Sequence, residues 1–178
     1  MKTALVVIDV QRGLCEGERP AFEAQQVIER INRVAAQARA AGALVIFVQH
    51  EAATELQYGT DAWQLARGLE VMPGDLHVRK TTCDSFHRTD LEQILKQRAV
   101  TRLVICGMHT EFCVDTTVRR ALALGYEVVL IADAHTTEDR PHLAAAQIIR
   151  HHNETLANIE SFGVRARVVS AGRAHFKD

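Results

Sequence analysis

Neither sign of charge dominates this sequence. It has 21 lysines and arginines against 22 aspartates and glutamates, which gives a formal net charge of −1. Proteins that bind nucleic acids or anionic membranes electrostatically carry a basic surface, and this balance gives no sign of one. We therefore expect no nucleic-acid partner and no membrane partner, and we favour a small molecule as the ligand.

Long apolar runs and linker compositions are missing as well. No run reaches the length of a transmembrane helix, and the first residues pass directly into a strand pattern without the apolar segment and cleavage site of a signal peptide. No stretch rich in proline, glycine and serine divides the chain, and 47% of the residues are hydrophobic. We therefore expect residues 1–178 to form one compact domain.

The cysteines do not have the spacing of a disulfide framework. The four of them, at positions 15, 83, 106 and 113, form no CxxC pair and are widely separated. This pattern favours reduced thiols in a cytosolic setting. We expect a cytoplasmic protein without a structural disulfide.

Apolar runs without polar alternation are present, and they predict strands that are covered on both faces of a parallel sheet. Five such runs lie at residues 4–10, 43–48, 103–106, 128–132 and 164–169, and a weaker sixth lies at 77–80.

Helical patterns fill the intervals between these runs. Apolar residues between 24 and 38 recur at three- and four-residue spacing and stop before Gly42. Residues 89–92 form a capping-box sequence, and Pro141 stands where the first residue of the last long helix is expected. Alternating strands and helices predict an α/β fold, a three-layer αβα sandwich around a six-stranded, parallel, doubly wound sheet in the order 3-2-1-4-5-6.

Ligands of such sheets bind at the carboxyl ends of the strands. Asp9, Lys80 and Cys113 each follow an apolar run, so we expect them to converge at this edge although they are distant in sequence. Residues 50–73 are the least regular part of the chain, and we expect a partly helical insertion there that covers the pocket.

Cys113 stands in a strand–turn–helix sequence, which places its thiol in the first turn of a helix. Unpaired N–H groups and the positive end of the helix dipole favour a thiolate there. The alternative is a buried cysteine that acts as a small hydrophobic side chain. We assign that role to Cys106, which lies inside a strand.

Hydrolysis of an amide by a thiol needs a nucleophile, a proton acceptor and donors for the oxyanion. Asp9 suits the acceptor, and the ammonium of Lys80 favours the thiolate. The backbone N–H groups of His109 and Cys113 are suited to the oxyanion. The alternatives are a turn-capping role for Asp9 and a solvated loop position for Lys80.

The sequence around each of these residues resembles the isochorismatase-like cysteine hydrolases. This superfamily includes nicotinamidases, N-carbamoylsarcosine amidohydrolases and streptothricin hydrolases. The matching segments are Val-Val-Ile-Asp-Val-Gln at 6–11, Lys-Thr-Thr-Cys-Asp-Ser-Phe at 80–86 and Gly-Met-His-Thr-Glu-Phe-Cys-Val at 107–114 with Thr117, and the likeness continues through 125–129 and 133–134.

The resemblance implies a catalytic triad with Asp9 as the base, Lys80 as the electrostatic partner and Cys113 as the nucleophile. It also implies a cis peptide bond between Met108 and His109. The implied reaction is cleavage of a C–N bond in a small amide, carbamoyl compound or lactam through a thioester. Two alternatives stay open: an isochorismatase-type vinyl ether hydrolase and a catalytically silent scaffold.

The second strand lacks the metal-binding motif of nicotinamidases. Those relatives carry an Asp-x-His pair there, whereas this chain has Gln49, His50 and Glu51. Consecutive residues of a strand point to opposite faces, so His50 and Glu51 are poorly placed to share an ion. We predict no metal and no cofactor, and we interpret His50 as a loop histidine hydrogen-bonded locally.

Several side chains are candidates for the substrate pocket, with packing in the core as the alternative for the aromatic ones. They are Phe22, Tyr58, Trp63, Phe86, His109, Phe112 and His135. We assign no catalytic role to Cys15 or Cys83. Symmetry and the resemblance predict a homo-oligomer, a dimer or a tetramer.

Overall fold

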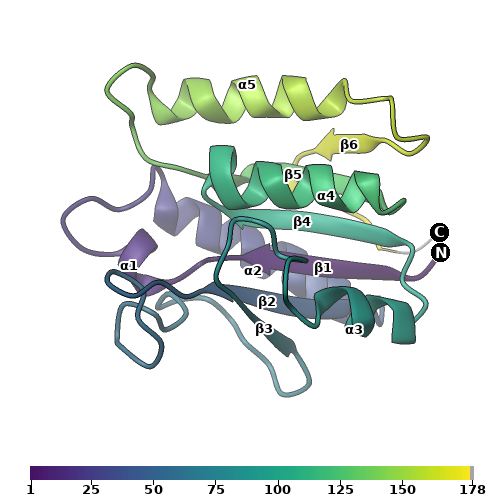
Figure 1. The fold of residues 1–178 in the computed structure, drawn as a ribbon, viewed down its shortest axis with the longest axis horizontal. Coiled ribbons are helices and arrows are strands. Elements are labelled where there is room, and N and C mark those ends of the chain that lie inside the picture. Colours follow the sequence, from purple (N-terminus) through teal and green to yellow (C-terminus); the bar gives the residue numbers. More distant parts are fainter. Residues whose placement is uncertain (177–178) are drawn as a thin grey trace.

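The structure is a computed structural model that describes residues 1–176. Its six parallel strands form one twisted sheet in the order β3-β2-β1-β4-β5-β6, with helices on both faces (Figure 1). The predicted fold class and strand order are therefore confirmed. The strands are β1 (Thr3–Ile8), β2 (Leu44–His50), β3 (Leu76–Lys80), β4 (Arg102–Met108), β5 (Glu127–Thr136) and β6 (Ala166–Val169).

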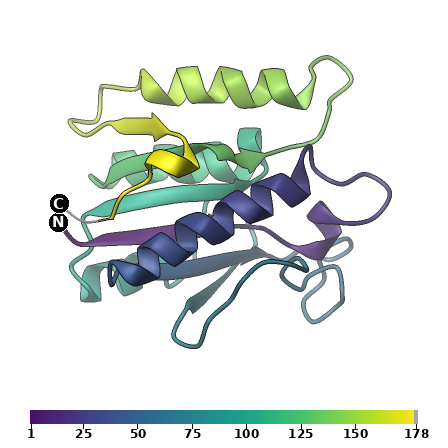
Figure 2. The ribbon, with the colours of Figure 1, turned by 180° about the vertical axis from the view of Figure 1, so that it is seen from behind.

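Helix α2 (Ala24–Ala40) covers one face of the sheet, and Figure 2 shows it in front of the strands. Its buried stripe includes Val27, Ile31 and Val34, which pack into one apolar cluster with side chains of β1, β2 and β4. Burial of such a side chain stabilises the fold by about 1.5–3 kcal/mol. The apolar residues that recur at three- and four-residue spacing in the sequence form this buried stripe.

The opposite face carries α3 (Leu91–Gln97), α4 (Asp115–Ala123) and α5 (Ala145–Ala157). Buried residues of these helices, among them Leu91, Val118 and Leu156, form the second apolar cluster with the other side of the same strands. Short elements complete the chain: α1 (Arg12–Cys15), the π-helical turn η1 (Thr110–Val114) and the 3-10 turn η2 (Ala171–Arg173). Because both faces are covered, the central strands read as continuous apolar runs.

The starts of two helices differ from the sequence prediction. Helix α3 begins at Leu91. Its N-cap residue is Asp90, whose side chain makes no capping hydrogen bond. The hydroxyl of Thr89 instead donates to the carbonyl of Ser85 at 2.6 Å and accepts from the N–H of Leu91 at 3.3 Å. The expected reciprocal capping box at 89–92 is therefore wrong, since Thr89 is engaged by the preceding turn.

Helix α5 begins four residues later than expected. Pro141 lies in a turn, and the helix starts at Ala145, whose N–H donates to the Asp139 carboxylate at 2.8 Å. The side chain of Gln147 accepts from the N–H of Ala144 at 3.2 Å. Polar side chains on either side of the start thus satisfy its free N–H groups, and Pro141 is not the first helical residue.

Residues 51–75 consist of turns and bends, so the expectation of a partly helical insertion is wrong. The segment is fastened to the sheet edge by polar contacts: an isolated bridge joins Gln11 to Leu65, and the Gln11 side chain donates to the carbonyl of Trp63 at 2.8 Å. Main-chain contacts of this kind fix a loop without helical periodicity. Within residues 1–176, no helix combines the length and apolar character needed to span a membrane.

Candidate active site

Three side chains from separate strands meet at the carboxyl edge of the sheet. Asp9 follows β1, Lys80 ends β3, and Cys113 lies in η1 after β4. The Lys80 Nζ atom is 2.7 Å from Asp9 Oδ2 and 3.2 Å from Cys113 Sγ. The structure therefore brings together the three residues that the sequence singled out.

Local backbone geometry sets the place of Asp9. Its φ of 52° lies in the left-handed region, and its N–H donates to the carbonyl of Val48 at 2.8 Å. Strand β1 thus ends at Ile8, two residues before the end of the predicted run at 4–10. Beside it, Gly107 has φ 119°, and a Cβ there would lie 2.0 Å from the carbonyl oxygen of Ile8. Only glycine lets β4 pass this close to β1.

The Lys80 ammonium is fully buried, with 0% of its side chain exposed beside an Asp9 side chain that is 1% exposed. Burial alone would lower the pKa of Lys80, but the neighbouring Asp9 and Cys113 together raise it above its usual value. Lysine therefore remains a cation in the site. Buried charges of opposite sign compensate one another in this way.

Cys113 is 9% exposed. Burial raises the pKa of its thiol above the ordinary value, the Asp9 carboxylate raises it further, and Lys80 opposes both effects. Burial is the largest of these causes, so the cost of burying a charged sulfur sets the direction of the shift. The resting group is a thiol, so the thiolate expected from the start of the helix is wrong for this state.

A buried contact ties the loop after β3 to α4. The Thr117 hydroxyl donates to Ser85 Oγ at 2.9 Å, and the Ser85 N–H donates to the Thr117 hydroxyl at 3.2 Å. Within the same loop the Thr82 carbonyl accepts from Lys80 Nζ at 3.1 Å. The loop that supports the lysine is thereby held against the helix that follows the cysteine.

His50 belongs to the site, although the sequence analysis placed it outside. It ends β2 and pairs in register with Lys80 of β3, and its Nδ1 lies 3.1 Å from Lys80 Nζ. Burial and the adjacent ammonium lower the pKa of His50, so its ring is neutral. The interpretation as a locally bonded loop histidine is wrong because β2 extends two residues beyond the predicted strand.

Asp9, His50 and Cys113 each offer a donor atom, and these atoms lie within 4.8 Å of one another. A carboxylate, an imidazole and a thiol are common ligands of zinc. Here, however, the Lys80 ammonium contacts all three groups. The ammonium already places a positive charge beside these donor atoms, so we assign them to the ammonium rather than to a metal ion. Metal independence stays a prediction.

The peptide bond between Met108 and His109 is cis, at the position that the resemblance implied. The carbonyl of His109 accepts from the N–H of Val114 at 3.2 Å, which is the i to i+5 bond of the π-helical turn. Burial lowers the pKa of the His109 side chain, whose Nε2 lies 4.0 Å from Glu138. The oxyanion role of the His109 and Cys113 N–H groups stays a prediction.

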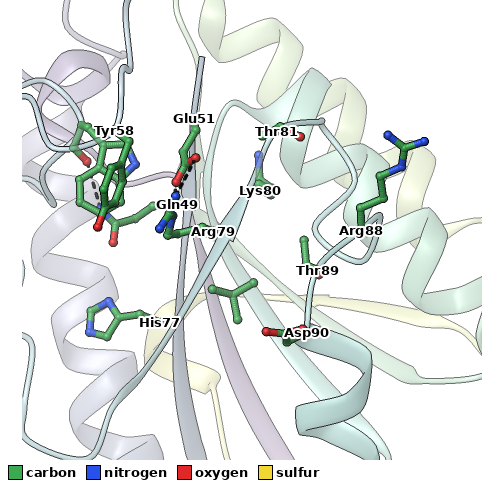
Figure 3. A pocket seen from close by; sticks show the side chains of 12 residues that line it. Gln49, Glu51, Tyr58, His77, Arg79, Lys80, Thr81, Arg88, Thr89 and Asp90 are labelled. Carbon is green, nitrogen blue, oxygen red and sulfur yellow. Dashed lines mark hydrogen bonds and ion pairs between the residues drawn. The ribbon is translucent and has the colours of Figure 1, made fainter. Parts of the chain in front are cut away.

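Two of the aromatic candidates line a groove of about 510 Å³ along the free edge of β3 (Figure 3). Tyr58 meets Trp63 edge to face at 4.8 Å, and the Arg79 guanidinium lies 3.8 Å from the centre of the Tyr58 ring. Arg79 also pairs with Glu51. Lys80 borders the groove as well, but its side chain is not exposed there.

Other candidates lie apart from the thiol or are enclosed. Phe86 is 6% exposed and stacks on Tyr126 at 6.0 Å, so it is a core residue rather than a ligand contact. Phe112 is exposed under the Arg140 guanidinium. Phe22 lines a separate hollow of about 270 Å³ between α2, β5 and α5.

His135 links two elements of the fold and also lines the hollow at Phe22, so its role as a substrate contact stays a prediction. It is 1% exposed, with Nδ1 2.9 Å from the Thr110 hydroxyl and Nε2 2.9 Å from Asn153 Oδ1. The Asn153 amide nitrogen donates to the carbonyl of Ala132, which leaves its oxygen to accept from Nε2–H. Burial lowers the pKa of His135 to about 4, so the ring is a neutral link between η1 and α5.

The fold and the site together define a doubly wound α/β protein with a buried carboxylate, ammonium and thiol at the carboxyl edge of its sheet. The Isochorismatase domain matches residues 3–161, and the chain belongs to the isochorismatase family.

Sequence relatives support this assignment. Two streptothricin hydrolases of Streptomyces noursei are 41% and 39% identical over 140 and 141 residues, which is 78% of this chain and 51% and 56% of theirs. The chain thus spans about half the length of these relatives. An uncharacterized isochorismatase family protein of Escherichia coli O157:H7, YecD, is 30% identical over 182 residues. The match covers 94% of this chain and 92% of that protein.

Solved structures agree in fold. A crystal structure of an isochorismatase family protein superposes with a TM-score of 0.86 at 39% identity, over 94% of this chain and 98% of that one. N-carbamoylsarcosine amidase from Thermoplasma acidophilum has a TM-score of 0.80 at 22% identity, over 98% and 99% of the two chains. At that identity the second likeness concerns the fold alone.

Proposed function

We propose that this protein is a metal-independent cysteine hydrolase that cleaves a C–N bond of a small amide, carbamoyl compound or lactam. The observation that carries the proposal is the pair of contacts from one buried ammonium, Lys80, to a carboxylate, Asp9, and to a thiol, Cys113. A thiol needs a base to give up its proton and a cation to stabilise the resulting charge, and these contacts offer both.

The first step is transfer of the Cys113 proton to Asp9. The Oδ1 atom of Asp9 is buried and has no hydrogen-bond partner among residues 1–176, so a lone pair is free to accept it. Transfer turns the carboxylate into an acid and the thiol into a thiolate. The Lys80 ammonium then faces sulfur as the only nearby anion of the triad.

In the second step the thiolate attacks the substrate carbonyl. The oxyanion is met by the backbone N–H groups of His109 and Cys113. Collapse of this intermediate breaks the C–N bond, and Asp9 returns its proton to the departing amine or ammonia. A thioester on Cys113 remains, and the carboxylate of Asp9 is regenerated.

Water completes the cycle. Asp9 takes one proton from a water molecule, the hydroxide adds to the thioester carbonyl, and collapse expels the sulfur as a thiolate. The proton on Asp9 then returns to Cys113, and the acid product leaves. Lys80 keeps its charge throughout, since the negative charge of the triad stays on Asp9 or on the Cys113 sulfur, both of which contact it.

Vinyl ether hydrolysis and a silent scaffold are the alternatives. The thiol and its lysine partner favour C–N cleavage, because an ether hydrolase of this family does not need a thiol nucleophile. A scaffold has no need to bury an ion pair against a thiol, an arrangement that costs desolvation free energy.

The test is a panel of small amides, carbamoyl compounds and lactams assayed for release of ammonia or amine, with a vinyl ether included. We expect Cys113→Ala to abolish turnover while retaining a wild-type circular dichroism spectrum. Cys83→Ala is the matched control, since Cys83 is a free, exposed cysteine. Undiminished turnover by folded Cys113→Ala would reject the nucleophile, and stoichiometric zinc or iron in untagged protein would reject metal independence.

A further inference from the structure

The Lys80 ammonium has more hydrogen-bond acceptors than hydrogens. An ammonium carries three N–H donors. Its Nζ lies within hydrogen-bonding distance of four acceptors: Asp9 Oδ2 at 2.7 Å, His50 Nδ1 at 3.1 Å, the Thr82 carbonyl at 3.1 Å and Cys113 Sγ at 3.2 Å. One acceptor is therefore always left over or shares a hydrogen.

The four acceptors are not equivalent. The Asp9 carboxylate is charged and closest, and the Thr82 carbonyl is a fixed main-chain group that belongs to the same loop. A neutral thiol sulfur is a weak acceptor, whereas a thiolate is a strong one. The third N–H therefore has two alternative partners, His50 Nδ1 and Cys113 Sγ, and the protonation state of the sulfur decides between them.

His50 is held in place for this contact. The Gln11 side chain, which is fully buried, accepts from the His50 N–H at 2.8 Å and donates to the His50 carbonyl at 3.0 Å. These bonds fix the main chain at the end of β2 independently of the imidazole. Because β2 lies between β3 and β1 in the sheet, His50 is brought beside both residues, and its donor atom lies within 4.8 Å of those of Asp9 and Cys113.

The ring can act only as an acceptor toward Lys80. An ammonium has no lone pair, so the Nδ1 atom that faces it must be unprotonated, and the ring hydrogen is on Nε2. The charged side chains whose fields act on His50 and Cys113 are few, and they come from the ends of three neighbouring strands: Asp9, Glu51 and Lys80.

We propose that His50 is a positioning residue that competes with Cys113 for the third N–H of Lys80. In the resting enzyme the N–H is directed to His50 Nδ1 and the sulfur keeps its proton. When that proton moves to Asp9, the ammonium turns and donates the same N–H to the thiolate. When the cycle ends and sulfur is protonated again, the N–H returns to His50.

The inference deepens the proposed function and makes a separate statement about the thiol. Formation of the thiolate in the wild type breaks one bond, from Nζ to His50, as it makes another. Without an acceptor at position 50 nothing is lost, so the pKa of Cys113 falls. His50 thus favours the protonated thiol in the resting site.

The experiment measures the rate of iodoacetamide alkylation at each cysteine by peptide mass spectrometry from pH 6 to 10, with the exposed Cys83 as an internal reference. His50→Leu removes the acceptor at similar volume, and His50→Val is a second acceptor-free variant should Leu fail to fold. His50→Asn is the matched control, since its Oδ1 takes the place of Nδ1. Circular dichroism establishes folding.

We expect alkylation of Cys113 below its pKa to rise about tenfold in the acceptor-free variants, the effect of one net hydrogen bond. In His50→Asn it should stay within about twofold of the wild type, by the same argument. Wild-type or slower rates in the acceptor-free variants, or equal acceleration in His50→Asn, would overturn the inference. Alkylation needs no turnover, so an inactive wild type would reject the proposed function and leave this result standing.

Discussion

Lys80 is the residue on which the electrostatics of the site depend. It is the one cation in contact with the buried Asp9 carboxylate and the Cys113 sulfur among the described residues. Burying a carboxylate without its counterion is costly, and a thiolate without a cation is costlier than a thiol. The stability of this edge of the sheet and the reactivity of the thiol therefore both depend on the Lys80 ammonium.

Replacement of Lys80 by methionine should reveal both roles. We expect Lys80→Met to lower the free energy of unfolding by about 3–5 kcal/mol, because it leaves a buried charge unpaired. The double variant Asp9→Asn/Lys80→Met removes both charges and should recover much of that loss. Neither variant should hydrolyse a substrate. Urea denaturation at pH 7.5 measures the stabilities, and a double variant no more stable than Lys80→Met would contradict the argument.

At this scale the sequence predicted which polar side chains converge, because Asp9, Lys80 and Cys113 each follow an apolar run. It did not predict His50, although the signal was available: in the order 3-2-1-4 the end of β2 must lie between Lys80 and Asp9. The direction of the Cys113 pKa shift was not predictable, since it depends mainly on how deeply the folded chain buries the sulfur.

Among the elements, the close passage of β4 beside β1 depends on Gly107. A Cβ at this position would lie 2.0 Å from the Ile8 carbonyl oxygen, and the φ of 119° disfavours other residues. Gly125 offers a matched comparison, with φ 86° and no atom within 4 Å of an added Cβ. The pair separates steric overlap from backbone strain.

We expect Gly125→Ala to cost about 1 kcal/mol, the price of a left-handed conformation without glycine. Gly107→Ala adds a backbone clash and should cost more than about 4 kcal/mol, which places it among exceptional substitutions. Thermal unfolding of both purified variants measures this difference. Equal melting temperatures would show that the strands move apart without penalty.

His135 connects two elements, since it joins Thr110 of η1 to Asn153 of α5 through its two ring nitrogens. Its pKa is lowered from 6.5 to about 4 in the folded protein. Below pH 6.5 the unfolded chain binds a proton that the folded protein does not, so stability falls as the pH drops from 6.5 toward 4. The full loss is on the order of 3 kcal/mol.

This prediction is tested by urea unfolding at pH 7.5 and pH 4.5 in the wild type and in His135→Gln. The variant cannot titrate at this position, so we expect it to lose less stability between the two pH values than the wild type. Protonation of other groups affects both proteins alike. The same pH dependence in both would mean that His135 is not the group responsible.

Sequence periodicity predicts some helices and loops of this fold but not others. The stripe of α2 was predictable because its burial repeats every three to four residues. Helix α5 starts later than Pro141 suggested, because Asp139 supplies the cap through a turn that local spacing does not encode. Residues 51–75 are held by individual contacts to distant residues such as Gln11, Gln49 and Arg39, which carry no periodic signal.

For the whole molecule, the sheet order follows from alternating elements and right-handed crossovers, and it was predictable for that reason. The groove beside β3 was not predictable, because it depends on how Tyr58, Trp63 and Arg79 pack along an edge strand. Cys113 is 9% exposed and borders neither this groove nor the hollow at Phe22. The thiol therefore lines neither of these two hollows.

We expect the protein to be a homo-oligomer, a dimer or a tetramer, since closed symmetric assembly is the common arrangement. Light scattering should give a mass two or four times that of the 19.8 kDa chain. If a neighbouring subunit completes the pocket around Cys113, specific activity should fall upon dilution as the assembly dissociates. A monomer at assay concentration would contradict the assembly, and constant specific activity across dissociation would show that each chain carries a complete site.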